Sequence, residues 1–151
     1  VLGELGDLYC QSGDFGKASQ CIEETLMIWK GKAGEKNIDY AKYLSMLGRA
    51  YDKRGLDDNA EQCLLQSISI SKETVGTNNF QYLGAMTNLG LHYNKTGNYD
   101  LALDKLREVA EITKEQLGPD NKNYATVVGN IALVYGNQKN IPKQKNTIYR
   151  H

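Results

Sequence analysis

The sequence repeats itself with a period of 42 residues, and this periodicity limits the fold more than any other feature. A branched aliphatic residue, a small residue and a tyrosine recur together along the chain. With only ten tyrosines in 151 residues, such a series in register is not expected by chance. A chain built from copies of one short unit predicts a stack of repeats rather than a single globular core. The three series are Leu5, Leu47, Leu89 and Ile131; Gly6, Gly48, Gly90 and Ala132; and Tyr9, Tyr51, Tyr93 and Tyr135.

Each unit has the pattern of two helices. In residues 41–54 the apolar side chains recur at helical spacing and form one stripe. Gly55 is expected to end this helix, because glycine is common just beyond a helix C-terminus. Asp57 or Asp58 is expected to cap a second helix that ends before Gly76. Neither helix can bury its stripe alone, so the units must stack, and the fold predicted is an all-α solenoid, an α-α superhelix.

The small residues predict how closely the helices pack. Gly48 and Ala60 lie on the two adjoining antiparallel helices of one unit, where small side chains let the backbones approach. A bulky residue at Gly48, Gly90 or Ala60 should overpack the pair and cost about 1–3 kcal/mol. The repeated tyrosines are expected to fill the space between one hairpin and the next.

These residues resemble the tetratricopeptide repeat, whose pattern is L-x-x-L-G-x-x-Y followed by glycine, an aromatic residue and alanine. The usual period is about 34 residues, and the longer period here is similar to the kinesin light chain type. The resemblance implies a non-enzymatic adaptor, with repeats at about 1–39, 40–81, 82–123 and 124–151, the first and last incomplete. The last repeat has a weak second helix that would begin near Pro142. The first copy of the pattern consists of Leu2, Leu5, Gly6, Tyr9, Gly13, Phe15 and Ala18.

Candidate binding residues follow from the same register. The first helices of such a stack line its concave side, and the resemblance implies that peptides or partner helices bind there. The cations are expected to pair with acidic groups, the apolar residues to take an anchor, and the asparagines to hold a ligand backbone. The prediction is a groove for an extended peptide with acidic and apolar side chains. The residues are Met46, Arg49, Lys53, Asn88, Leu91, Lys95, Asn130 and Leu133.

No catalytic or metal site is predicted. The sequence has no P-loop, no G-x-G-x-x-G, no H-E-x-x-H and no G-x-S-x-G. His92 stands beside Tyr93 without an acid or nucleophile in its local pattern, so we interpret it as an ordinary helical histidine. The three cysteines form no C-x-x-C pair and lie far from both histidines. We therefore expect no enzyme activity, no cofactor, no metal and no small-molecule substrate.

Charge and composition narrow the partners. Eighteen basic and eighteen acidic residues give a net charge of zero, which argues against nucleic acid and against an anionic membrane. No apolar run approaches the roughly 20 residues that span a bilayer. The sparse, odd number of cysteines favours a reducing compartment. We predict a cytoplasmic location, with a cytoskeletal or ciliary association as its variant. Since the sequence begins at Val1 rather than Met, we expect it to be part of a longer protein.

Two alternatives to a peptide-binding adaptor stay open. The repeats could be a structural subunit of a large cytoskeletal, ciliary or transport assembly, with contacts at the edges and the convex face. They could also be the regulatory repeat region of a multidomain signalling protein. A linear peptide should bind the isolated repeats only in the first case.

Overall fold

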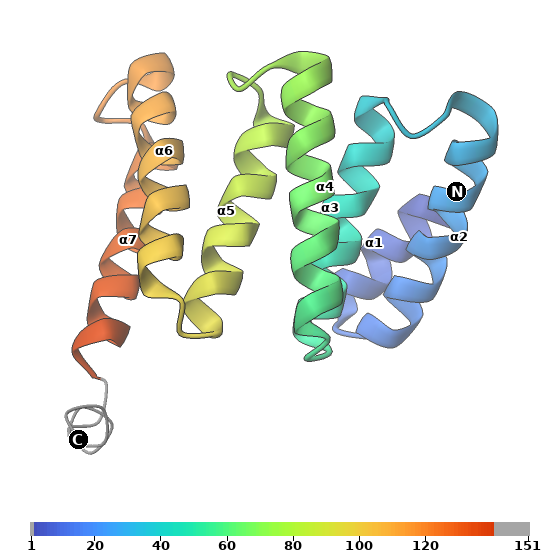
Figure 1. Cartoon of the computed structure of the whole chain (residues 1–151), viewed down its shortest axis with the longest axis horizontal. Coiled ribbons are helices and arrows are strands. Elements are labelled where there is room, and N and C mark those ends of the chain that lie inside the picture. Colours follow the sequence, from blue (N-terminus) through green and yellow to red (C-terminus); the bar gives the residue numbers. More distant parts are fainter. Residues whose placement is uncertain (1, 141–151) are drawn as a thin grey trace.

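The computed structural model describes residues 2–140 and shows helices but no strand among them. The helices stack side by side in chain order, each antiparallel to the one before it (Figure 1). The predicted all-α solenoid is confirmed. The predicted second helix of the fourth repeat, with Pro142, falls outside the described residues. The helices are α1 (Leu2–Ser12), α2 (Phe15–Ala33), α3 (Ile38–Lys53), α4 (Asp57–Val75), α5 (Phe80–Lys95), α6 (Tyr99–Leu117) and α7 (Lys122–Lys139).

The predicted helix ends at Gly55 and Gly76 are confirmed. Both glycines have φ near +80°, 77° and 82° respectively, in the left-handed region where a side chain would be strained. After Gly55 the amide of Leu56 donates to the carbonyl of Tyr51 at 2.9 Å, the 6→1 bond of a Schellman motif. This bond closes the end of α3 and turns the chain directly into α4.

The predicted cap at Asp57 or Asp58 is wrong. Leu56 occupies the N-cap position of α4, and no side chain caps that helix. Because the Schellman turn returns the chain to helical geometry at once, both aspartates already lie in the first turn. There their carboxylates face the positive end of the helix dipole.

Asparagine side chains cap the first helix of successive hairpins, a periodic signal in the sequence that the helix predictions did not use. Asn37, Asn79 and Asn121 stand 42 residues apart, directly before α3, α5 and α7. Each Oδ1 accepts a hydrogen bond of 2.8 Å from a backbone N–H of the first turn. The caps fix where each first helix begins.

The close approach inside each hairpin is confirmed at the repeated glycines. A Cβ atom at Gly48 would lie 2.8 Å from Cγ of Leu64, and one at Gly90 would lie 2.7 Å from Cγ of Leu106. Both leucines are buried, so they fill the space that the missing side chains leave. Only glycine fits these positions without displacement of the core.

The repeated tyrosines join neighbouring hairpins, as predicted. Tyr51 on α3 donates a hydrogen bond to Glu23 on α2, and Tyr93 on α5 donates one to Glu61 on α4 at 2.9 Å. Each tyrosine therefore reaches the second helix of the preceding hairpin. The last junction differs, because Tyr135 on α7 meets a cation, Arg107.

A second set of contacts links α3 directly to α5, and α5 to α7. Asn88 Nδ2 donates to Ser45 Oγ at 3.1 Å, Lys95 Nζ to Asp52 Oδ1 at 2.9 Å, and Asn137 Nδ2 to Asn94 Oδ1 at 3.0 Å. In each pair the two residues are 43 apart, so the contacts follow the repeat. These bonds align α3, α5 and α7 into one face. No helix among the described residues is long and apolar enough to cross a membrane.

Candidate functional site

The predicted binding residues all lie on first helices that contact one another. The contacts α3 to α5 and α5 to α7 make one continuous face of three helices. Of the eight residues, only Arg49, Lys53, Lys95 and Leu133 are largely exposed, and the others are half-buried. The residues are Met46, Arg49 and Lys53 on α3, Asn88, Leu91 and Lys95 on α5, and Asn130 and Leu133 on α7.

A pocket of about 240 Å³ between α3 and α5 brings four of these residues together. Arg49 and Lys53 lie on its α3 side, and Asn88 and Leu91 on its α5 side. Neither cation takes part in an ion pair among residues 2–140. Leu64 of α4 and Asp52 of α3 complete the lining, and the Asp52 carboxylate is paired with His92 and Lys95. Cations without an ion-pair partner, beside a carboxamide and an aliphatic side chain, are able to pair with an anionic group.

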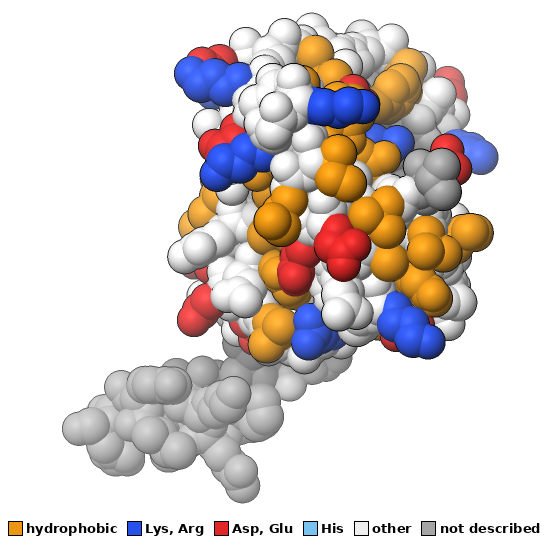
Figure 2. Space-filling model, turned by 90° about the vertical axis from the view of Figure 1, so that its right-hand side faces the viewer, with side chains coloured by type: hydrophobic (Ala, Val, Ile, Leu, Met, Phe, Trp, Pro, Cys, Tyr) orange, Lys and Arg blue, Asp and Glu red, His pale blue; other side chains and the backbone are white. Residues whose placement is uncertain are grey.

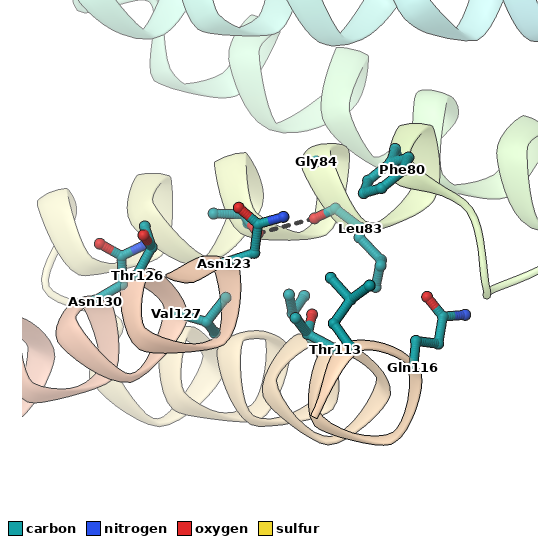
Figure 3. A pocket seen from close by; sticks show the side chains of 12 residues that line it. Phe80, Leu83, Gly84, Thr113, Gln116, Asn123, Thr126, Val127 and Asn130 are labelled. Atoms are coloured by element: carbon teal, nitrogen blue, oxygen red, sulfur yellow. Dashed lines mark hydrogen bonds between the residues drawn. The ribbon is translucent and has the colours of Figure 1, made fainter. Parts of the chain in front are cut away.

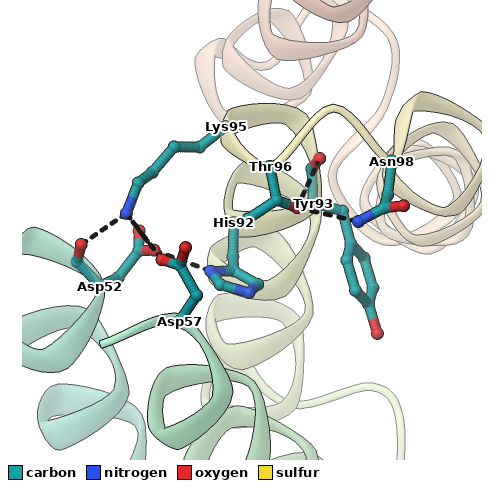
Figure 4. A network of polar contacts seen from close by, with 7 residues as sticks. All are labelled: Asp52, Asp57, His92, Tyr93, Lys95, Thr96 and Asn98. Carbon is teal, nitrogen blue, oxygen red and sulfur yellow. Dashed lines mark hydrogen bonds and ion pairs between the residues drawn. The ribbon is translucent and has the colours of Figure 1, made fainter. Parts of the chain in front are cut away.

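Lys95 differs from these two cations, because its charge is already neutralised (Figure 4). Its Nζ lies 2.9 Å from Asp52 Oδ1, 3.1 Å from Asp57 Oδ1 and 2.6 Å from the Asp52 carbonyl oxygen. Burial lowers the pKa of Lys95, but the hydrogen bonds to the two aspartates outweigh it and leave the pKa raised. Lys95 therefore links α5 to α3 and α4.

His92 has an acidic partner that its local sequence does not reveal. Its Nδ1 lies 2.7 Å from Asp52 Oδ1, and only 2% of the residue is exposed. The partner comes from the preceding repeat, 40 residues earlier. Burial raises the pKa of Asp52, but the hydrogen bonds from His92 and Lys95 outweigh this and hold it below its usual value.

Asp52, Asp57 and His92 also resemble a set of metal ligands. Their ligand atoms lie within 4.8 Å of one another. However, the ammonium group of Lys95 already bridges the two carboxylates, and a metal ion would have to displace it. The cluster is accordingly an ion-pair network that joins three helices.

The remaining predicted residues are more scattered. Met46 lines a separate shallow pocket with residues of α1, and Leu133 is 51% exposed on α7. Asn88 uses one N–H of its amide to bond Ser45. Its Oδ1 and second N–H still offer one acceptor and one donor to a ligand backbone.

A further pocket, of about 260 Å³, lies between α5, α6 and α7 (Figure 3). Of the predicted residues only Asn130 reaches it. Its walls carry no charged side chain, and Phe80 at its edge is 75% exposed. A sequence signal for this pocket was present at two repeat positions. Leu83 and Val109 stand 42 residues after Ala41 and Ser67, which are smaller. Its lining is Phe80, Leu83, Gly84, Thr87, Val109, Thr113, Gln116, Leu117, Asn123, Thr126, Val127 and Asn130.

Comparison with known proteins agrees with this architecture. The family model of the tetratricopeptide repeat matches residues 1–73 and 82–143. The chain is similar, at 21% identity and a TM-score of 0.82, to the nearly identical TPR-like repeats of a Podosopora anserina protein described as a kinesin light chain. It is also similar, at 22% identity and a TM-score of 0.78, to BtubC (BKLC) from P. vanneervenii.

These matches extend over most of the present chain but only part of the solved structures. The aligned region covers 91% and 92% of this chain, and 65% and 55% of the other two. At identities this low, the structural similarity shows that the fold is shared and shows nothing about function. No curated protein matches the sequence.

Proposed function

The chain belongs to the tetratricopeptide repeat family, and on that premise we propose that it binds an acidic segment of a partner protein across α3 and α5. Repeats of this family mediate protein–protein interaction and are typically not catalytic. The observation that supports the acidic segment is the pocket between α3 and α5. There the free cations Arg49 and Lys53 stand beside Asn88 and Leu91, and the carboxylate in the lining, Asp52, is already paired with His92 and Lys95.

Each side chain of this pocket has a separate role in the proposal. The guanidinium of Arg49 and the ammonium of Lys53 pair with carboxylates of the segment. The free donor and acceptor of Asn88 bond the segment's backbone. Leu91 contributes apolar contact at the floor. Lys95 acts indirectly, because its bonds to Asp52 hold α5 against α3 and so set the width of the pocket.

The proposal is tested by double charge reversal, Arg49→Glu with Lys53→Glu. The matched control is Lys32→Glu with Lys72→Glu, two exposed lysines near the ends of α2 and α4. Both proteins and the unchanged chain are used to capture partners from native extract, and affinity for each identified partner is then measured. We expect binding to fall at least about tenfold for the pocket variant only, and to weaken with added salt. Equal binding by all three proteins would contradict the proposal.

The structural alternative also has a specific observation in its favour. At the end formed by α1 and α2, apolar side chains are spread over much of the face, and acidic ones lie among them near its middle (Figure 2). Leu5 and Leu8 are 39% and 58% exposed, whereas Leu47 and Ala50 at the equivalent positions of α3 are buried. An apolar face of this kind favours packing against another subunit.

Sedimentation distinguishes this second function from the first. Association that depends on protein concentration, and that Leu8→Asp abolishes, would support a structural role through this end. A monomer at every concentration would count against it. For either function we propose a cytoplasmic location, in keeping with the free thiols of Cys10, Cys21 and Cys63.

A further inference from the structure

We propose that the pocket between α5, α6 and α7 receives a bulky apolar side chain of the bound segment, an aromatic or large aliphatic one. This inference rests on the proposed function, because it describes a second subsite for the same segment. The apolar anchors expected from the sequence were Met46, Leu91 and Leu133. The structure offers a more apolar site elsewhere on the face.

The lining of this pocket selects a neutral, apolar group. Leu83, Val109, Leu117 and Val127 form its walls, and its polar members are uncharged hydroxyl and amide groups. A charged side chain would lose its hydration there without gaining a counter-ion. The volume is about 260 Å³, and an apolar cavity of about 150 Å³ already accommodates benzene. An aromatic ring or a large aliphatic group therefore fits.

The exposed Phe80 at the edge adds a second, independent observation. Three-quarters of this phenylalanine is in contact with solvent, although it is among the largest apolar side chains in the chain. It lines the same pocket as Leu117, which is 40% exposed. Large apolar groups clustered at the edge of a cavity are typical of an interaction site.

The pocket arises from a departure of the third repeat from the second. In the second repeat, Ser67 Oγ donates to the Ala41 carbonyl at 2.6 Å, and both residues are fully buried. This bond and the small side chains hold α3 and α4 together. The equivalent residues of α5 and α6 are Leu83 and Val109, which are larger and cannot form the bond. Apolar side chains therefore stand in place of the hydrogen-bonded pair, and both of them line the pocket.

The pocket adjoins the cationic one across α5. Thr87 lines the apolar pocket and Asn88, the next residue, lines the pocket with Arg49 and Lys53. The two pockets therefore lie on either side of one helix. Packed helices are about 8–10 Å apart. An extended segment in the polyproline II conformation rises about 3.1 Å per residue and turns every third side chain to the same side. The acidic and apolar side chains of the segment should be about three residues apart.

A substitution that fills the pocket without disturbing the core is available at Gly84. This residue is exposed on α5 and lines the pocket, and no atom lies within 4 Å of the position its Cβ would take. Gly84→Leu should therefore be accepted and should occupy the pocket. Gly129→Leu on α7 is the matched control, because Gly129 is equally open but does not line the pocket.

The first experiment tests the pocket alone, with N-acetyl-L-phenylalaninamide as the probe. The full chain, labelled with nitrogen-15, is titrated and its amide resonances are followed by NMR. We expect saturable shifts at Gly84, Thr113 and Val127, loss of saturation in Gly84→Leu, and unchanged binding in Gly129→Leu. No saturable shift at these amides, or equal binding in Gly84→Leu, would overturn the inference.

The second experiment separates the pocket from the function on which it rests. A short synthetic peptide carries glutamate and phenylalanine three residues apart, and two further peptides replace glutamate by glutamine or phenylalanine by alanine. We expect the first peptide to bind about tenfold or more tighter than either of the others, because the two contacts reinforce each other.

The peptide whose affinity falls shows whether the acidic site or the apolar subsite is wrong. If the glutamine peptide binds as tightly as the first while the alanine peptide does not, the acidic site is wrong and the apolar pocket stands. If the alanine peptide binds as tightly while the glutamine peptide does not, the apolar subsite is overturned and the proposed function stands.

Discussion

A single methyl group at Gly90 should destabilise the fold, whereas the same group at Gly84, on the same helix, should not. In Gly90→Ala the new Cβ would lie 2.7 Å from Leu106 Cγ and 2.9 Å from its Cδ2. Leu106 is fully buried, so it cannot turn away into solvent. In Gly84→Ala the new Cβ meets no atom within 4 Å.

The magnitude follows from two opposing effects. Alanine is favoured over glycine inside a helix by about 0.5–1 kcal/mol, and both variants gain this. Overpacking of a buried contact costs about 1–3 kcal/mol, and only Gly90→Ala incurs it. The two variants should therefore differ by about 1–3 kcal/mol in the free energy of unfolding, or about 2–12 °C in Tm for a chain of this length.

Urea unfolding followed by circular dichroism measures this difference. Equal stability of Gly90→Ala and Gly84→Ala would refute the close approach of α5 and α6. A double-mutant cycle with Leu106→Ala adds a second criterion. Removal of the leucine branch should reduce the cost of Gly90→Ala, because the two changes share one contact. The same cost in both backgrounds would show that the strain has another origin.

Two further predictions concern titratable groups at the junction of the second and third repeats. Burial and the hydrogen bond to Glu61 raise the pKa of Tyr93 to about 12, so stability should fall as pH rises from about 10, where an unfolded tyrosine ionises, towards 12. Tyr93→Phe should flatten this fall in Tm, at a cost near neutral pH of about 1 kcal/mol for the lost bond. The pKa of Asp52 is depressed by His92 and Lys95 despite its burial, so its contribution should be lost as pH drops below about 4. Unfolding midpoints should decline less in Asp52→Asn than in the unchanged chain over that range, and parallel declines would contradict the assignment.

The architecture follows from the sequence because its determinants are local. A helical apolar stripe, a glycine with positive φ at Gly55 and an asparagine cap at Asn79 each act within a few residues. The period of 42 residues then requires every unit to pack on the next in the same way. Even here the predicted cap of α4, Asp57 or Asp58, was one or two residues too late, because a backbone turn at Leu56 rather than a side-chain cap begins the helix.

For the candidate site, the sequence could predict only which face of the helices the residues lie on. Register shows that Arg49, Lys53 and Lys95 lie on first helices, since residues three and four apart share one side of a helix. It cannot show which of these cations is free. Lys95 is neutralised by Asp52 from the preceding repeat, 43 residues away, and His92 has the same partner.

The sequence by itself determined the repeat, the hairpins, the glycines where backbones meet and the helices that form the binding face. Tertiary structure alone decided where that face is hollow and where its charge is compensated. The apolar pocket depends on how Leu83 of α5 and Val109 of α6 pack with their neighbours. Such packing is set by side-chain volumes on different helices, and helical periodicity gives directions rather than distances.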